Sequence, residues 1–219
     1  MVISINGEKE KDRASAALLK MGEAAKETLQ LSVQALRNQD AELARKVIEQ
    51  DDVIDNYQIV IEEEVSRLAA YEPATSMEYK RQIAMVKIAS DLERVGDYAS
   101  NIASVVLKIK KDPLIKPLIH IPQLAALAIQ MLTAALKAFI EWNSDLAEAV
   151  CKRDDEADDL YELISEELVT IVGSGVSQKE VNQAIWLLQV AEWLERAADH
   201  ATNIGEETVH IITGKRIKY

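Results

Sequence analysis

The chain has 219 residues, of which 48% are hydrophobic and only 5% aromatic, and its formal net charge is −12. This charge argues against a nucleic-acid-binding surface, which needs a basic footprint, and against tight adsorption to anionic lipid. Glycine and proline are scarce, with 7 and 4 residues, so few turns and long helices with cores of Ala, Leu, Ile and Val are expected.

Apolar residues recur at every third or fourth position through the first seventy residues, as one buried face of a helix requires. This spacing predicts a first helix over 8–36 and a second over 40–70. The polar segment 38–40 predicts the turn between them. Pro73 predicts the end of the second helix, because the residue before a proline avoids helical geometry.

A third helix is predicted to begin at a capping box made by Thr75 and Glu78. Its apolar seam runs from Ile88 to Ile109 with alternating spacings of four and three, which is typical of left-handed helical bundles. Three prolines lie between 111 and 123, and they predict the joint between two halves of the chain.

The second half repeats this plan. Its first helix is predicted over 123–142, and its second lies between the polar segment 143–145 and the glycine-containing segment 173–175. Its third helix is predicted to begin with a capping box at Ser177 and to end at Gly214.

The clearest repeat joins segment 92–103 to segment 194–205, which lies 102 residues later. Leu, Glu, Arg, Asp, Ala, Asn and Ile occupy matching places in both. We therefore predict an all-α fold of two tandem antiparallel three-helix bundles, with six long helices in all. The predicted domains are a first bundle over 1–112 and a second over 113–219.

Acidic residues four positions apart recur on the second and third predicted helices of both halves. A spacing of four places two side chains on one helix face, and the heptad frame places these pairs off the buried seam. Oxygen ligands suit hard cations, and several carboxylates can bridge more than one ion. The sequence therefore predicts metal sites on the bundle surface at Asp51, Asp55, Glu93 and Asp97, and at Asp154, Asp158, Glu195 and Asp199.

Other residues in the repeated segments invite interpretation. Arg94 and Arg196 are expected to form salt bridges with nearby acids. Gly96, which corresponds to Ala198 in the repeat, suggests that a neighbouring helix packs closely against it. Surface or rim positions are expected for the three histidines, which have no repeat partners: His120, His200 and His210.

Three features bear on location. The single cysteine, Cys151, cannot form an internal disulfide, which fits a reducing compartment. Segment 1–13 soon becomes charged, so no signal peptide is expected. The longest apolar stretch, 124–140, is short and interrupted by polar residues, so no membrane insertion is expected. These features favour a cytoplasmic protein.

At these residues the chain resembles the PhoU family, regulators of bacterial phosphate uptake. The resemblance is carried by Glu72-Pro73-Ala74 with Arg81, by segment 91–103 and by the closing stretch 195–206. It implies two tandem three-helix bundles, and in some members multinuclear iron or zinc clusters on the bundle surface. The E(D)xxxD motifs that would hold such clusters are here Asp51/Asp55, Glu93/Asp97, Asp154/Asp158 and Glu195/Asp199.

The resemblance also implies a function. It suggests a cytoplasmic, non-enzymatic adaptor between the ATPase of the phosphate ABC transporter and a phosphate-sensing histidine kinase. Such an adaptor restrains phosphate uptake and phosphate-starvation genes when phosphate is plentiful, and pairing of two chains into a homodimer is left open. The polar segment 1–13 departs from the Leu-rich, aromatic opening familiar in the family.

Two other interpretations remain open from the sequence. A metalloenzyme, either an oxidase or a phosphohydrolase, could use the same carboxylates. However, the sequence offers neither paired Glu-x-x-His motifs nor a buried cluster of the kind found in di-iron oxidases. Alternatively, the acidic residues could simply keep a passive helical scaffold soluble.

Overall fold

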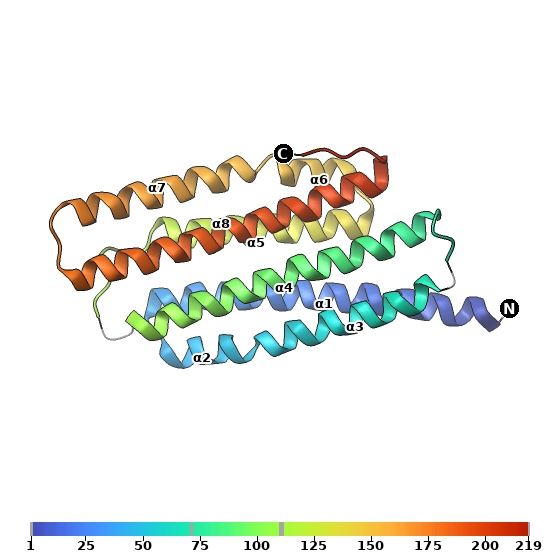
Figure 1. The fold of residues 1–219 in the computed structure, drawn as a ribbon, viewed down its shortest axis with the longest axis horizontal. Helices are drawn as coiled ribbons and strands as arrows, with labels where there is room; N and C mark the ends of the chain where they lie inside the picture. Colours follow the sequence, from blue (N-terminus) through green and yellow to red (C-terminus); the bar gives the residue numbers. More distant parts are fainter. Residues whose placement is uncertain (1, 71, 110–111, 219) are drawn as a thin grey trace.

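The computed structural model describes the backbone of residues 2–70, 72–109 and 112–218, and the side chains of these ranges from 13 onward. In these ranges the chain forms eight α-helices and no β-strand. The helices run along one long axis, so the molecule is elongated (Figure 1). The helices are α1 (Val2–Asn38), α2 (Ala41–Glu49), α3 (Asp51–Ala69), α4 (Met77–Ile109), α5 (His120–Glu141), α6 (Ser144–Cys151), α7 (Asp154–Gly173) and α8 (Gln178–Thr213).

The predicted plan of six rods in two three-helix bundles is confirmed. The first bundle contains α1, α4 and a rod formed by α2 and α3, and the second contains α5, α8 and a rod formed by α6 and α7 (Figure 1). The sequence pattern predicted each middle rod as one helix, whereas the structure interrupts it at Gln50 and at Lys152 and Arg153. As a result, two of the predicted metal ligands, Asp51 and Asp154, become the first residues of α3 and α7.

Most predicted helix ends are confirmed by their caps. The Asp40 side chain accepts hydrogen bonds from the backbone N–H groups of Glu42 and Leu43, each at 3.0 Å, and so begins α2. Ser177 forms the predicted capping box at the start of α8, and Gly214 ends α8 in the left-handed conformation, with φ of 72°.

Three predicted boundaries need correction. The predicted capping box of Thr75 is wrong by one residue, because α4 begins at Met77 and the backbone N–H of Tyr79 donates to Ser76 Oγ at 3.0 Å. Helix α5 begins three residues earlier than predicted and accommodates Pro122 in its first turn, where a missing N–H costs no hydrogen bond. Helix α1 extends beyond both ends of the predicted range.

One large apolar core joins the two bundles, and a small separate cluster of Ala138, Ala147 and Val209 lies in the second bundle. Fully buried side chains from every long rod belong to the large core, including Leu18, Leu92, Leu124 and Leu194. The bundles meet where α1 packs against α5 and α4 packs against α8. Gly22 permits the first of these contacts, because a Cβ atom at this position would lie 2.3 Å from Leu136 Cδ1.

Helix α5 contains the apolar stretch considered in the sequence. With 22 residues it is, among the described parts of the chain, the one helix long and apolar enough to cross a membrane on those two measures. In the structure it packs against α8, α1, α6 and α7, and eleven of its side chains are buried. Its apolar composition is therefore accounted for by its place in the core.

Candidate functional site

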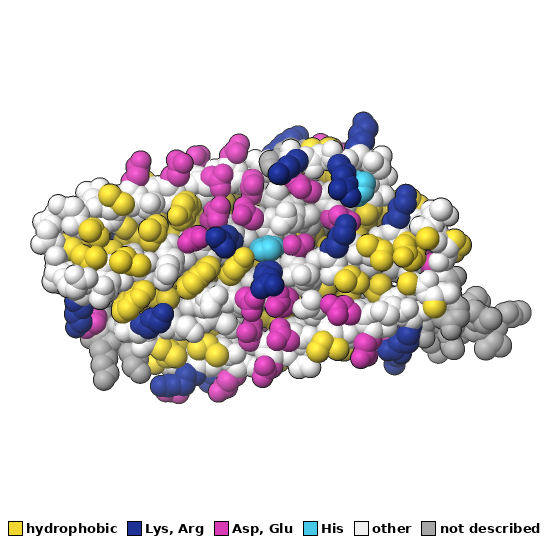
Figure 2. Space-filling model, viewed as in Figure 1, with side chains coloured by type: hydrophobic (Ala, Val, Ile, Leu, Met, Phe, Trp, Pro, Cys, Tyr) yellow, Lys and Arg dark blue, Asp and Glu magenta, His cyan; other side chains and the backbone are white. Residues whose placement is uncertain are grey.

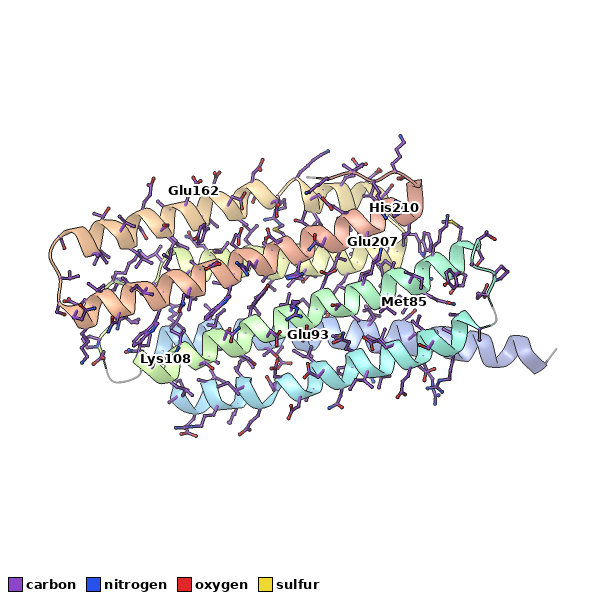
Figure 3. All side chains as sticks on the ribbon, in the orientation of Figure 1. Met85, Glu93, Lys108, Glu162, Glu207 and His210 are labelled. Carbon is purple, nitrogen blue, oxygen red and sulfur yellow. The ribbon has the colours of Figure 1, made fainter. Side chains whose placement is uncertain are left out.

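The predicted metal ligands gather on one face of the molecule. Acidic side chains lie across the middle of the face built by α3, α4, α7 and α8 (Figure 2), and Glu93 projects from the middle of α4 (Figure 3). All eight predicted ligands are half-buried or exposed, so the expectation that they lie off the core is confirmed. We call Asp51, Asp55, Glu93 and Asp97 the first cluster, and Asp154, Asp158, Glu195 and Asp199 the second cluster.

In the first cluster, carboxylates of α3 and α4 repel one another. Partial burial and the negative charges of Asp97 and Asp55 raise the pKa of Asp51. Partial burial and the charge of Asp97 likewise raise the pKa of Glu93, and the Arg94 guanidinium opposes part of this increase. The structure therefore brings the two predicted pairs of this half close enough to interact electrostatically.

In the second cluster the perturbation is larger. Burial, followed by the charges of Asp199 and Asp158, raises the pKa of Glu195 to about 7, and the Arg196 guanidinium opposes part of this increase. Burial and the charges of Asp154 and Asp158 also raise the pKa of Asp199. Burial and the charge of Asp154 raise the pKa of Asp158. Crowded carboxylates with raised pKa values favour a bound cation, because a cation offsets their mutual repulsion.

A glycine lets α3 approach α4 at the first cluster. A Cβ atom at Gly96 would lie 2.8 Å from Ile54 Cδ1 and 3.4 Å from Asp51 Oδ1. The close helix packing predicted at Gly96 is therefore confirmed. The approach holds the start of α3, with its carboxylate, against the middle of α4.

Two hydroxyl groups that sequence reasoning missed support the first ligand of each cluster. Thr202 Oγ1 donates a hydrogen bond to Asp154 Oδ1 at 2.9 Å. Ser100 occupies the matching place beside Asp51, where its hydroxyl favours the charged carboxylate although its geometry falls outside that of a hydrogen bond. The signal was present in the sequence, because a hydroxyl residue recurs one position before the asparagine of each repeated segment.

The donor chemistry of both clusters fits a hard cation, since each offers four carboxylates from two adjacent helices. As placed in the described residues, however, no three Asp, Glu, His or Cys side chains converge closely enough to hold a metal ion. The assignment of the eight acids as metal ligands therefore stays a prediction. The clusters lie on an open face, so their geometry does not favour an oxidase or phosphohydrolase, which would enclose its substrate.

The repeated arginines form the salt bridges that the sequence predicted, but with different partners. Arg94 Nη1 lies 3.0 Å from Asp97 Oδ2, and Arg94 Nε lies 3.5 Å from Glu93 Oε2. Arg196 Nη2 instead lies 2.7 Å from Glu192 Oε1. Thus the first cluster contains a paired arginine, whereas the arginine of the second half pairs with a carboxylate outside the cluster.

His200 joins the two bundles, so the prediction of a surface or rim role was wrong for this residue. Its Nδ1 atom lies 2.8 Å from Asp91 Oδ1, and its Nε2 atom lies 3.3 Å from the Tyr98 hydroxyl. The His200 side chain is only 18% exposed. Tyr98 holds the position of His200 in the first repeat, so equivalent residues of the two halves meet where α4 and α8 pack together.

A second contact joins the same two helices nearer the end of α8. Lys87 Nζ donates to both carboxylate oxygens of Glu207, at 2.9 and 3.0 Å; Glu207 and its neighbour His210 lie toward one end of the molecule in Figure 3. Next to the His200 contact, an open hollow of about 530 Å³ borders the second cluster. It is lined by Tyr98, Tyr161, Glu192, Glu195, Arg196, Asp199, His200 and Asn203.

The chain matches a family model twice. The model is described as “PhoU domain”, and it matches residues 18–106 and 121–208. These two ranges cover most of the two bundles, and each contains one carboxylate cluster.

Similar proteins are known by sequence and by structure. A “Phosphate-specific transport system accessory protein PhoU homolog” of Clostridium acetobutylicum is 36% identical over 96% of this chain and 95% of its own length. A second such homolog, from Thermotoga maritima, is 32% identical over 92% of this chain and 85% of its own length. The crystal structure of PhoU from Pseudomonas aeruginosa matches with a TM-score of 0.89 and 28% identity, over 95% of this chain and 99% of that chain.

Proposed function

This chain belongs to the PhoU family, and we propose that it is an accessory regulator that restrains phosphate uptake and the phosphate-starvation response. The observation that carries this proposal is the family match to both bundles, since the two matched ranges, 18–106 and 121–208, include most of the chain. The names of the related proteins, which describe accessory proteins of a phosphate-specific transport system, support the same role. They also favour a regulatory protein over an enzyme.

Its proposed partners are the ATPase of a phosphate ABC transporter and a phosphate-sensing histidine kinase. An adaptor between two proteins needs two binding surfaces, and the elongated shape with two related bundles supports this proposal, because each bundle has an outer face of its own (Figure 1). We place this adaptor in the cytoplasm, where an ABC transporter ATPase and a kinase domain are both accessible. Pairing of two chains into a homodimer remains a prediction.

We further propose that the two clusters bind iron or zinc ions as a multinuclear centre. The support is electrostatic: partial burial and like charges raise the pKa values of carboxylates in both clusters. A bound cation would neutralise these carboxylates and link α3 to α4 and α7 to α8. The chemistry that the cation supplies is charge neutralisation, and the carboxylates would position it.

The regulatory role is tested by deleting the gene and measuring alkaline phosphatase activity in phosphate-rich medium. We expect high activity in the deletion strain and low activity when the intact gene is restored, because the starvation response is then no longer restrained. Equal activity with and without the gene would contradict the proposal. The matched control is a deletion strain to which the gene is restored with an early stop codon, because it contains the same introduced DNA but makes no protein.

A further inference from the structure

A second hollow lies at the end of α8, where the chain turns back. Helix α8 ends at Gly214, and the C-terminal segment 215–218 then runs back over α6 (Figure 1). Between this segment, α4 and α8 lies a hollow of about 540 Å³. The segment contributes Arg216, Ile217 and Lys218 to its lining, and none of the lining residues belongs to a carboxylate cluster.

One apolar side chain holds the segment in place. Ile217 packs against the small separate cluster formed by α5, α6 and α8. Its neighbours Arg216 and Lys218 are exposed and line the hollow, so the anchor keeps two cations beside it. The chain as a whole has a net charge of −12, yet Lys and Arg side chains gather at this end of the face (Figure 2). The positive charge is therefore a local feature.

The carboxylates that line the same hollow already have partners. Asp91 Oδ1 lies 2.8 Å from His200 Nδ1. Lys87 Nζ donates to both carboxylate oxygens of Glu207, at 2.9 and 3.0 Å. Glu206 is also engaged by another group. An incoming anion would therefore meet carboxylates whose charge is at least partly offset.

The two cations of the segment have no such partners. Neither Arg216 nor Lys218 forms an ion pair with another described residue. His210 lines the hollow too, at the end of α8 near Glu207 (Figure 3). Its Nδ1 atom is buried and has no hydrogen-bond partner in the described part of the chain. The groups of this hollow that lack a partner are thus a guanidinium, an ammonium and an imidazole nitrogen.

We propose that this hollow binds a phosphate group, either as the free ion or as part of a small organic phosphate. The planar guanidinium of Arg216 suits two oxygens of one phosphate, and Lys218 adds a second positive charge. Two cations favour a dianion over a single carboxylate. A volume of about 540 Å³ lies within the range of small-molecule sites. Carboxylates farther away matter little, because salt screens charges beyond about 8 Å at physiological ionic strength.

Binding of the free ion would bring the proposed regulator into direct contact with the ion whose uptake it restrains. This consequence rests on the proposed function. The binding itself is measured on the purified chain, so it succeeds or fails independently of the alkaline phosphatase measurement in cells.

The test titrates the purified full chain with inorganic phosphate, by calorimetry in a chloride buffer of constant ionic strength. We expect saturable binding with a Kd of roughly 1 mM or lower. Arg216→Gln with Lys218→Gln should weaken it at least about tenfold, because charge-assisted hydrogen bonds are lost. Lys87→Gln should weaken it as well, because the Glu207 carboxylate then loses its partner and repels the anion.

The matched control is Lys215→Gln, since Lys215 belongs to the same segment, is exposed and does not line the hollow. It should change the affinity by less than about threefold, because its charge is screened by solvent. An equal loss in this control would show a general attraction to a basic segment and would overturn the site. Absence of saturable binding up to about 10 mM phosphate would overturn it too. Circular dichroism verifies that all variants keep their helix content.

A parallel titration with phenyl phosphate distinguishes the two sources of the phosphate group. Tighter binding of the ester than of the free ion would identify an organic phosphate as the ligand, and equal or weaker binding would identify the free ion. Either result supports the site only if Arg216→Gln with Lys218→Gln removes the binding. Affinity that this double substitution leaves unchanged would contradict the proposal for both compounds.

Discussion

The two carboxylate clusters have acidic residues at corresponding positions and different surroundings. In the first, Arg94 pairs with Glu93 and Asp97 and offsets part of their charge. In the second, Arg196 pairs outside the cluster, and the pKa of Glu195 rises to about 7. Burial is the largest cause of the raised pKa at both glutamates, and the neighbouring arginine opposes part of the increase at each. The two halves thus keep the same acidic residues while the arginine of each half pairs with different carboxylates.

The same comparison shows features that both halves retain. Near the ends of the bundles, Arg13 lies 3.9 Å from Glu64, and at the matching positions Lys116 contacts Glu167. Burial would raise the pKa of Glu167, but the hydrogen bond from Lys116 and the nearby His120, whose Nδ1 lies 3.1 Å from Glu167 Oε1, outweigh it and lower this pKa. The halves therefore share an ion pair at one end and differ at the centre, where the clusters lie.

The largest expected effect tests whether two related halves behave as one folding unit. Leu92 and Leu194 occupy matching, fully buried positions in one core. Substituting either by Ala should lower the free energy of unfolding by about 3 kcal/mol, because it leaves a cavity. Since the core is continuous, each variant should still unfold in one transition, measured by circular dichroism in urea.

The matched control is Leu19→Ala, because Leu19 is 44% exposed and should change stability by less than about 0.5 kcal/mol. Two separate unfolding transitions, with only one of them shifted by each core substitution, would show that the halves fold independently. That result would contradict the shared core.

A smaller effect concerns the pH dependence of the metal-free chain. The pKa of Glu195 rises from 4.5 to about 7 on folding, so between these pH values the folded chain binds a proton that the unfolded chain releases. The protonated Glu195 carboxyl therefore contributes its full stabilisation of the folded chain below about pH 4.5, and this stabilisation is lost as the pH rises toward 7. The free energy of unfolding of the unaltered chain therefore decreases between these pH values. After allowance for solvent screening, we expect this decrease to be smaller by about 1 to 2 kcal/mol in Glu195→Gln.

The comparison variant is Glu93→Gln in the first cluster, where burial also raises the pKa but Arg94 Nε lies only 3.5 Å from the Glu93 carboxylate. We expect it to flatten the pH profile less than Glu195→Gln does, as measured by thermal unfolding between pH 4.5 and 7.5. Identical profiles for the two variants would show that the two clusters are electrostatically equivalent.

The smallest effect distinguishes the two hydroxyl groups. Thr202→Val removes the hydrogen bond to Asp154 and should cost about 1 kcal/mol of stability. Ser100→Ala should cost less, because the Ser100 hydroxyl makes no hydrogen bond to Asp51 of comparable geometry. Chemical denaturation of both variants measures the difference, and a larger loss for Ser100→Ala would reverse the expected order.

Local spacing explains why the helices, most caps and both clusters could be predicted from the sequence. The acidic pairs were expected outside the core because they lie on a different helix face from the buried apolar residues. Gly96 indicated that a neighbouring helix packs closely against α4. The breaks before Asp51 and Asp154 were missed, because the apolar spacing continues across them. The cap of α4 is Ser76 and not Thr75 as predicted, because backbone geometry, and not residue type alone, decides which of two neighbouring hydroxyl residues caps a helix.

The tertiary contacts between the halves had no local signal. His200 and Asp91 are 109 residues apart and meet because α4 packs against α8. The orientation of Arg196 depends on Glu192, which lies just before the repeated segment and has an uncharged counterpart. Comparison of the repeats alone therefore found the recurring acidic pairs and missed Glu192 as the salt-bridge partner of Arg196.

The most direct test of cation binding is the metal content of the chain purified without chelator. The account predicts iron or zinc bound to the unaltered chain, and its loss when Asp97 and Asp199 are both replaced by Ala. Helix content should stay unchanged by circular dichroism, since both side chains lie off the core. Bound metal that persists at the same stoichiometry in the doubly substituted chain would contradict the assignment of these clusters as the cation sites.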